Sequence, residues 1–147
     1  SVDRVSGKDI YNFYFQEQKK NGDVIFEWNS KNFFKPALSW VLDSEYSIWN
    51  YFDGNSITLS NNNNFLVTSG GLKSVINIDR KSGKPIWLLG DKDHGVNDFK
   101  YINDEMDGPS VVYYANQLSN GNILLFDSGC LKSVHRTVFF ANSNSFF

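Results

Sequence analysis

The chain has 147 residues and a net charge of −2, and its 41% hydrophobic content is typical of globular proteins. This length suits one domain with a sizeable core, and the single cysteine excludes an internal disulfide framework. No basic surplus is present to neutralise a phosphate backbone, and no apolar run is long enough for a membrane-spanning helix. We therefore expect neither a nucleic-acid partner nor a membrane span.

Short runs rich in Val, Ile, Leu and Phe, bounded by Gly, Asn or Ser turns, predict β-strands along the chain. In chain order they lie near residues 11–16, 24–28, 54–59, 65–68, 74–79, 85–89, 111–118, 123–126 and 136–140. No stretch shows convincing helical periodicity, and residues 34–49 are predicted to form a long loop. The pattern therefore predicts an all-β fold.

An internal repeat connects two of the predicted hairpins. Residues 59–70 resemble residues 118–129 at an offset of about 59 positions, and Lys-Ser-Val follows each segment. A repeat of this length is typical of β-propellers, whose blades are four-stranded antiparallel sheets. The layout predicts about two and a quarter blades: the end of one in residues 1–29, a complete one in 30–90, and an incomplete one in 91–147. Its open strand edges call for the remaining blades or a protein partner.

Several motifs, in this order and spacing, resemble those of one family. Residues 22–30 resemble a family segment in which a strand ends in Trp and then Ser. Residues 49–57 are similar to the motif Trp-Asp-Tyr-Phe-His-Ile-Asn-Ser-Val, and residues 65–99 and 118–129 continue the pattern. The chain thus resembles the arylsulfotransferase-like β-propellers. This resemblance implies sulfuryl transfer between phenols through a histidine, no cofactor, and a secreted or membrane-associated location.

The basic residues that this chemistry needs are replaced in the chain. The family His after Tyr-Phe aligns with Asp53, and two family arginines align with Gly70 and Leu88. A second family His aligns with Tyr113, or with Tyr114 if the alignment shifts by one residue. Imidazole and guanidinium groups move protons and hold anionic oxygens, whereas a carboxylate repels a sulfate. We therefore predict a non-catalytic binding or assembly scaffold.

Two alternatives stay open: an active aryl sulfotransferase whose His and Arg lie outside this segment, and a structural subunit completed by another chain. The resemblance also gives candidates for a channel wall or ligand site, namely Tyr51, Phe52, Asn55, Tyr113, Tyr114 and Arg136. Aromatic walls of this kind hold a flat aromatic ligand or a sugar, although packing between blades is their commoner role.

The remaining reactive residues form no recognisable site. His94 lies in a polar loop, and His135 precedes Arg136 at a predicted strand start. The acidic stretch 91–107 has the residue types of a calcium site but not the spacing of a calcium loop, so no metal is expected. Cys130 has no adjacent base, and we expect an idle thiol there.

Overall fold

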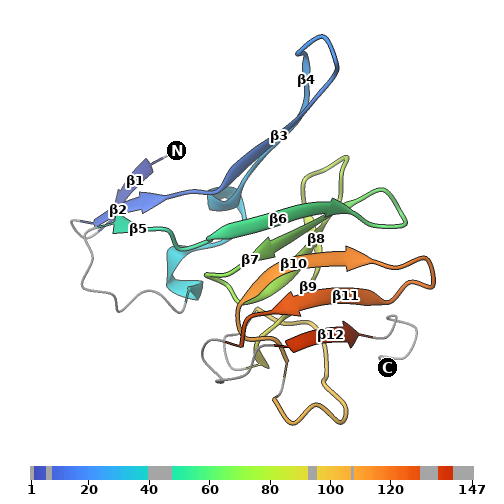
Figure 1. The fold of residues 1–147 in the computed structure, drawn as a ribbon. Helices are drawn as coiled ribbons and strands as arrows, with labels where there is room; N and C mark the ends of the chain where they lie inside the picture. Colours follow the sequence, from blue (N-terminus) through green and yellow to red (C-terminus); the bar gives the residue numbers. More distant parts are fainter. Residues whose placement is uncertain are drawn as a thin grey trace.

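A computed structural model describes residues 2–5, 8–39, 48–92, 96–106, 108–129 and 136–140 (Figure 1). Over these ranges the protein is all-β, as predicted, with short 3₁₀ turns at Ser30–Asn32 (η1) and Pro36–Leu38 (η2). The strands are β1 (Val2–Val5), β2 (Lys8–Tyr11), β3 (Tyr14–Gln18), β4 (Val24–Asn29), β5 (Ile48–Trp49), β6 (Gly54–Leu59), β7 (Phe65–Ser69), β8 (Ser74–Ile78), β9 (Pro85–Gly90), β10 (Val112–Gln117), β11 (Ile123–Asp127) and β12 (Arg136–Phe140).

Each predicted strand is present, and most end within one or two residues of the predicted position. The agreement comes from the turns, since Asn63, Gly83 and Gly121 all adopt the positive φ that a tight turn requires. Strands β1, β2 and β5 were not predicted, because they lack an alternating apolar pattern. They form a small separate sheet in the order β1-β2-β5, in which β2 and β5 are parallel.

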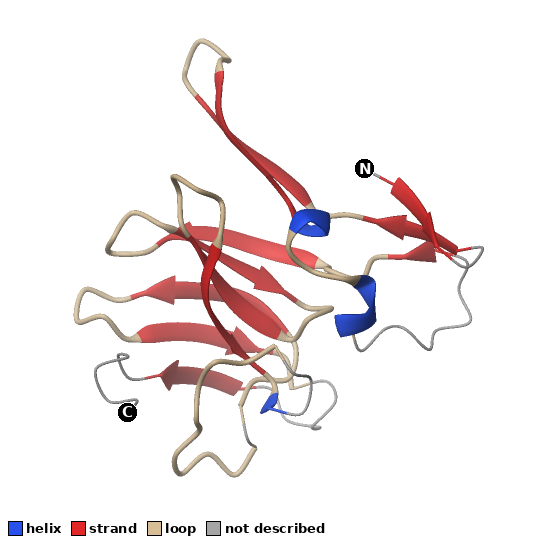
Figure 2. Cartoon of the chain, turned by 180° about the vertical axis from the view of Figure 1, so that it is seen from behind, coloured by secondary structure: helices blue, strands red, loops and turns tan. Residues whose placement is uncertain are grey.

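A four-stranded antiparallel sheet, β6-β7-β8-β9, forms the centre of the described structure. The hairpin β3-β4 and the three-stranded sheet β10-β11-β12 are also antiparallel. Figures 1 and 2 show the turn end of the β3-β4 hairpin projecting beyond the central sheet. No sheet closes on itself within the described ranges, so the structure supports antiparallel sheets and leaves the number of blades undetermined.

The central sheet is covered on both faces, which explains why β7 and β8 are buried along their whole length. On one face Phe65 and Ile76 pack with Phe15 and Trp28 of the β3-β4 hairpin. On the other face a second cluster joins the central sheet to β10 and β11; it consists of Leu66, Val75, Leu89, Val112, Ala115, Ile123 and Leu125. Three sheets are thus stacked in chain order.

Trp28 joins the β3-β4 hairpin to the central sheet. Its indole Nε1 donates a hydrogen bond to the backbone oxygen of Gly83 at 2.9 Å, and its side chain is only 2% exposed. Phe15 meets Phe65 edge-on, with the ring centroids 5.2 Å apart. A bidentate ion pair between Arg80 and Glu17 closes the same junction nearer the surface. Aromatic packing therefore fixes how the hairpin sits on the sheet.

The internal repeat is present in three dimensions, with a period of 58 residues between equivalent positions. Strands β6 and β7 correspond to β10 and β11, since Gly54 matches Val112 and Phe65 matches Ile123. The sequence comparison gave an offset one residue longer, because it aligned the Leu-Ser-Asn letters of the two turns. A shift of one residue exchanges the two faces of a strand, so the register of side chains was decided only by the structure.

Candidate functional site

Three of the four substituted motif positions lie together where β6 and β10 begin. The backbone amide of Gly70, just after β7, donates to the backbone oxygen of Asp53 at 2.9 Å. A Cβ atom on Gly70 would lie 2.6 Å from Asp53 Oδ2, so the carboxylate occupies the space that a side chain at position 70 would take. Thr68 Oγ1 donates to the backbone oxygen of Tyr113 at 3.4 Å. We call Asp53, Asn55, Gly70 and Tyr113 the bulge site.

Two β-bulges shape this site, at equivalent places in the repeat. Asn55 is the extra residue in β6 opposite β7, and Tyr113 is the extra residue in β10 opposite β11. Both side chains are exposed, and Asn55 Nδ2 donates to the backbone oxygen of Val112 at 3.1 Å. Bulges redirect a side chain and often occur beside binding sites. The structure thus brings together Asn55 and Tyr113, which the sequence had both indicated.

The Asp53 carboxylate has an amide as its partner. Asn50 Nδ2 donates to Asp53 Oδ1 at 3.1 Å, and the Asp53 amide donates to Asn50 Oδ1 at 3.3 Å. Burial raises the pKa of Asp53 above its usual value, because the charged form loses contact with water. Among the side chains that the structure describes, no cation contacts this carboxylate. The bulge site is therefore unfavourable for an anion.

An open groove of about 520 Å³ lies beside the bulge site. We call it the aromatic groove; it is lined by Tyr11, Asn12, Phe13, Tyr14, Asn50 and Gly54. Phe13 forms its base and stacks on the buried Phe52, with centroids 5.0 Å apart and the rings within 10° of parallel. A Cβ on Gly54 would lie 2.3 Å from the Phe13 ring, so only glycine fits there. The groove offers aromatic rings and amides to a ligand.

Tyr51 and Phe52, which the sequence indicated as channel-lining residues, lie instead in the core. They are 1% and 0% exposed, and neither side chain is accessible to a ligand in this structure. The Tyr51 hydroxyl donates to Ser30 Oγ at 2.8 Å, and Phe52 packs against Phe13. Aromatic residues line both protein cores and binding channels, so the sequence could not separate the two roles.

Of the other candidates, Leu88 and Tyr114 have described side chains, and no described contact links either of them to the bulge site. Leu88 lies in β9, pairs with Ile76 and packs half-buried in the core under the β3-β4 hairpin. Tyr114 is exposed on β10, and Arg136 is the first residue of β12, where its backbone pairs with Asp127. His94, His135 and Cys130 fall outside the described residues.

Sequence reasoning missed the aromatic groove. Its residues Tyr11, Phe13 and Tyr14 were included in a predicted strand, but β3 begins only at Tyr14. Asn12 and Phe13 connect β2, which ends at Tyr11, to β3, and the residues around this connection line the groove together with Asn50. The only available signal was the density of aromatic residues between positions 11 and 15.

Three described carboxylates of the acidic stretch make contacts within the fold. Asp91 forms a buried ion pair with Lys73 at 3.2 Å, and Asp98 Oδ2 accepts from the Leu88 amide at 2.7 Å. Asp104 accepts from the amides of Met106 and Gly108. In the described part of the chain, no three His, Cys, Asp or Glu side chains lie close enough to hold a metal ion. Nor is any described helix long and apolar enough to cross a membrane.

The chain matches no family model, curated protein or solved structure. The arylsulfotransferase-like resemblance therefore stays a prediction from the motifs. What the described site offers chemically is one partly buried carboxylate, amides and phenols. These groups can bind polar and aromatic molecules.

Proposed function

We propose that the chain is a segment of an arylsulfotransferase-like β-propeller that acts as a non-catalytic binding scaffold. One observation carries this proposal: where three motif positions meet, the Asp53 carboxylate lies against Gly70 with the Asn50 amide as its partner. A sulfuryl-transfer site needs positive charge to hold the moving anionic group. A partly buried carboxylate at that position opposes binding of a sulfate ester.

The arrangement of the sheets supports a propeller segment. Strands β6 and β10 lie side by side, because Asn55 and Thr58 of β6 donate to the backbone oxygens of Val112 and Ala115 of β10. Each of these strands is the first of its sheet, and the two sheets pack face to face. In a propeller, the first strands of neighbouring blades line the central channel in this way.

The aromatic groove suggests the class of ligand. Tyr11 and Tyr14 are almost half exposed, and their rings stand beside the amides of Asn12 and Asn50. Exposed phenol rings stack on a flat molecule, while amides bind its polar edge without favouring either charge. A neutral aromatic compound fits these groups better than an aryl sulfate, because none of the residues that line the groove is a Lys or Arg that could hold a sulfate.

The decisive experiment combines a transfer assay with a binding assay. We expect no transfer of sulfate from phenyl sulfate to a phenol above the rate in buffer, and saturable binding of phenol that Tyr11→Ala weakens. Tyr114→Ala, which removes an equally exposed tyrosine outside the groove, is the matched control. Turnover that is abolished by Tyr113→Phe or Arg136→Ala would contradict the non-catalytic assignment.

A second function, that of a subunit completed by further strands, is favoured by an unpaired edge. Among the described strands β3 pairs only with β4, although the central sheet has four strands. Between β3 and β6 lies an open hollow of about 260 Å³, where Ile57 and Leu59 are 41% and 48% exposed. Light scattering should show self-association that Leu59→Lys reduces; a stable monomer at high concentration would argue against this role.

A further inference from the structure

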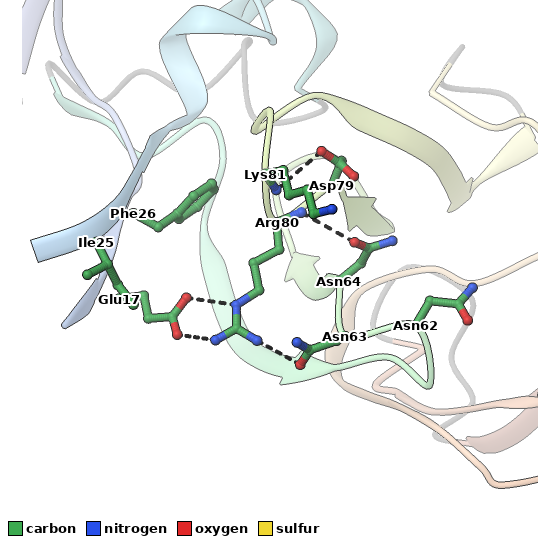
Figure 3. A pocket seen from close by; sticks show the side chains of 9 residues that line it. All are labelled: Glu17, Ile25, Phe26, Asn62, Asn63, Asn64, Asp79, Arg80 and Lys81. Atoms are coloured by element: carbon green, nitrogen blue, oxygen red, sulfur yellow. Dashed lines mark hydrogen bonds and ion pairs between the residues drawn. The ribbon is translucent and has the colours of Figure 1, made fainter. Parts of the chain in front are cut away.

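A second pocket, which shares no lining residue with the aromatic groove, lies between the β3-β4 hairpin and two turns of the central sheet (Figure 3). It has a volume of about 520 Å³ and is bounded by the hairpin, the β6-β7 turn and the β8-β9 turn. We call it the amide pocket; its lining is Glu17, Ile25, Phe26, Asn62, Asn63, Asn64, Asp79, Arg80 and Lys81. None of these residues is a substituted motif position, and none belongs to the bulge site or the aromatic groove.

The charges in the amide pocket are balanced within the protein. Two carboxylates and two cations line it, and Arg80 binds Glu17 through two hydrogen bonds. This contact holds the pKa of Glu17 below its usual value. Hydrogen bonds from Ser82 likewise lower the pKa of Asp79. The pocket therefore has no excess charge with which to select an anion or a cation.

The hydrogen-bonding groups left over are mainly donors. Arg80 Nη1 donates to Asn63 Oδ1 at 2.7 Å, and the Arg80 amide donates to Asn64 Oδ1 at 3.3 Å. The side-chain NH₂ groups of Asn63 and Asn64 are not used in these two bonds and can still donate to a ligand. Of the five guanidinium N–H groups of Arg80, two are not used in the bonds to Glu17 and Asn63. Within the described residues the Asn62 amide has no hydrogen-bond partner, as Figure 3 also shows.

These groups are held in place before any ligand arrives. The Arg80 guanidinium lies over the Phe65 ring, 5.5 Å from its centroid, and is bonded on its other sides to Glu17 and Asn63. Asn63 adopts a φ of 63°, which fixes the tip of the β6-β7 turn. A fixed set of donors loses little conformational entropy on binding, and this favours affinity.

The pocket also has an apolar side. Ile25 and Phe26 of β4 face the amides across Arg80 in Figure 3, and Ile25 is the extra residue of a bulge in β4. Apolar side chains on one side of the pocket and amide N–H donors on the other suit a molecule that has one apolar face and oxygen atoms around its edge. A pyranose ring has this character, and its hydroxyls accept from amides and donate to carboxylates.

We propose that the amide pocket binds a neutral carbohydrate. Balanced charge argues against an anionic sugar or a sulfate, and the surplus of N–H donors matches ring and hydroxyl oxygens. The next unit of the repeat provides a contrast, because Gly121 occupies the place of Asn63 with the same turn geometry. The carbohydrate site is therefore specific to the β6-β7 turn and independent of the ligand of the aromatic groove.

The test is a titration of the whole chain, followed by NMR, with methyl glycosides of glucose, mannose, galactose and N-acetylglucosamine. We expect saturable shifts of the side-chain signals of Asn62, Asn63 and Arg80. Asn63→Gly retains the turn, since glycine accepts positive φ, and should weaken binding about fivefold through the lost hydrogen bond. Asn62→Ala should act in the same direction.

Asn120→Ala is the matched control, because Asn120 occupies the equivalent turn position outside the pocket and should change the affinity less than about twofold. The proposal fails if none of the four glycosides gives a saturable shift. It also fails if binding is unaffected by both Asn62→Ala and Asn63→Gly, if inorganic sulfate binds more tightly, or if the shifts concentrate at Asn50 and Tyr11. Phenol binding at the aromatic groove reports separately on the proposed function.

Discussion

Replacing Trp28 tests whether the β3-β4 hairpin is held to the central sheet by one buried side chain. The indole is 2% exposed and lies within 5.6 Å, centroid to centroid, of Phe15, Phe33 and Phe52. Trp28→Ala removes this packing, and for a large aromatic such a change costs about 4 kcal/mol of unfolding free energy. For a chain of this size the melting temperature should fall by roughly 12 °C.

A second variant separates packing from hydrogen bonding. Trp28→Phe keeps most of the ring contacts but removes the 2.9 Å hydrogen bond to the Gly83 oxygen, so we expect a loss of about 2 kcal/mol. Val24→Ala, an exposed change in the same strand, should cost less than about 0.5 kcal/mol. Urea unfolding followed by circular dichroism measures all three. If Trp28→Ala cost no more than Val24→Ala, the packing of the hairpin described here would be incorrect.

Three further predictions concern residues in or near the candidate site. Gly71→Ala should prevent stable folding, or cost at least about 3 kcal/mol, because its Cβ would lie 2.0 Å from the Tyr51 backbone oxygen; a normal thermal melt would refute this. Ser30→Ala removes the acceptor for the Phe13 amide and the Tyr51 hydroxyl, and should lower the free energy of unfolding by about 3 kcal/mol in a urea titration. In a chain that already carries Tyr51→Phe, the same substitution should cost less, because the hydroxyl partner is already gone. Asp53→Asn should stabilise the protein near neutral pH and have a smaller effect below about pH 4. Because the folded-state pKa of Asp53 is raised, the protonated carboxyl stabilises the fold fully at pH values below the unfolded-state pKa. This stabilisation is lost as the pH rises through the folded-state pKa. The difference between variant and parent melting temperatures across pH measures this, and a gap that shrinks toward neutral pH would contradict the burial of the carboxylate.

The sequence was informative about local structure, since turns and short apolar runs depend on neighbouring residues. Asn63 and Gly121 identified the two hairpins, and the strands on either side followed at nearly the predicted positions. The residues just before Tyr14 show where prediction from local sequence fails. The aromatic ones have strand propensity, but Phe13 lies between β2 and β3 and lines the aromatic groove.

The structure does not treat the four substituted positions alike. Asp53 lies against Gly70, and Tyr113 accepts a hydrogen bond from Thr68 through its backbone oxygen, whereas Leu88 lies in another strand with its side chain in the core. Tyr51 and Phe52 are buried for the same reason, because the hairpin covers that face of the sheet. Which face of a sheet is covered by another element depends on residues far away in the sequence, so a local sequence pattern cannot predict it.

The amino-acid sequence by itself determined the all-β class, the repeat and the positions of the turns, because each of these depends on residues close together along the chain. Only the tertiary structure decided the register of the repeat, the two bulges that expose Asn55 and Tyr113, and the balanced charges around Arg80. Those features come from contacts between residues far apart in the sequence, such as the ion pair of Arg80 with Glu17. The free energy of such a contact depends on both segments together, so neither segment alone predicts it.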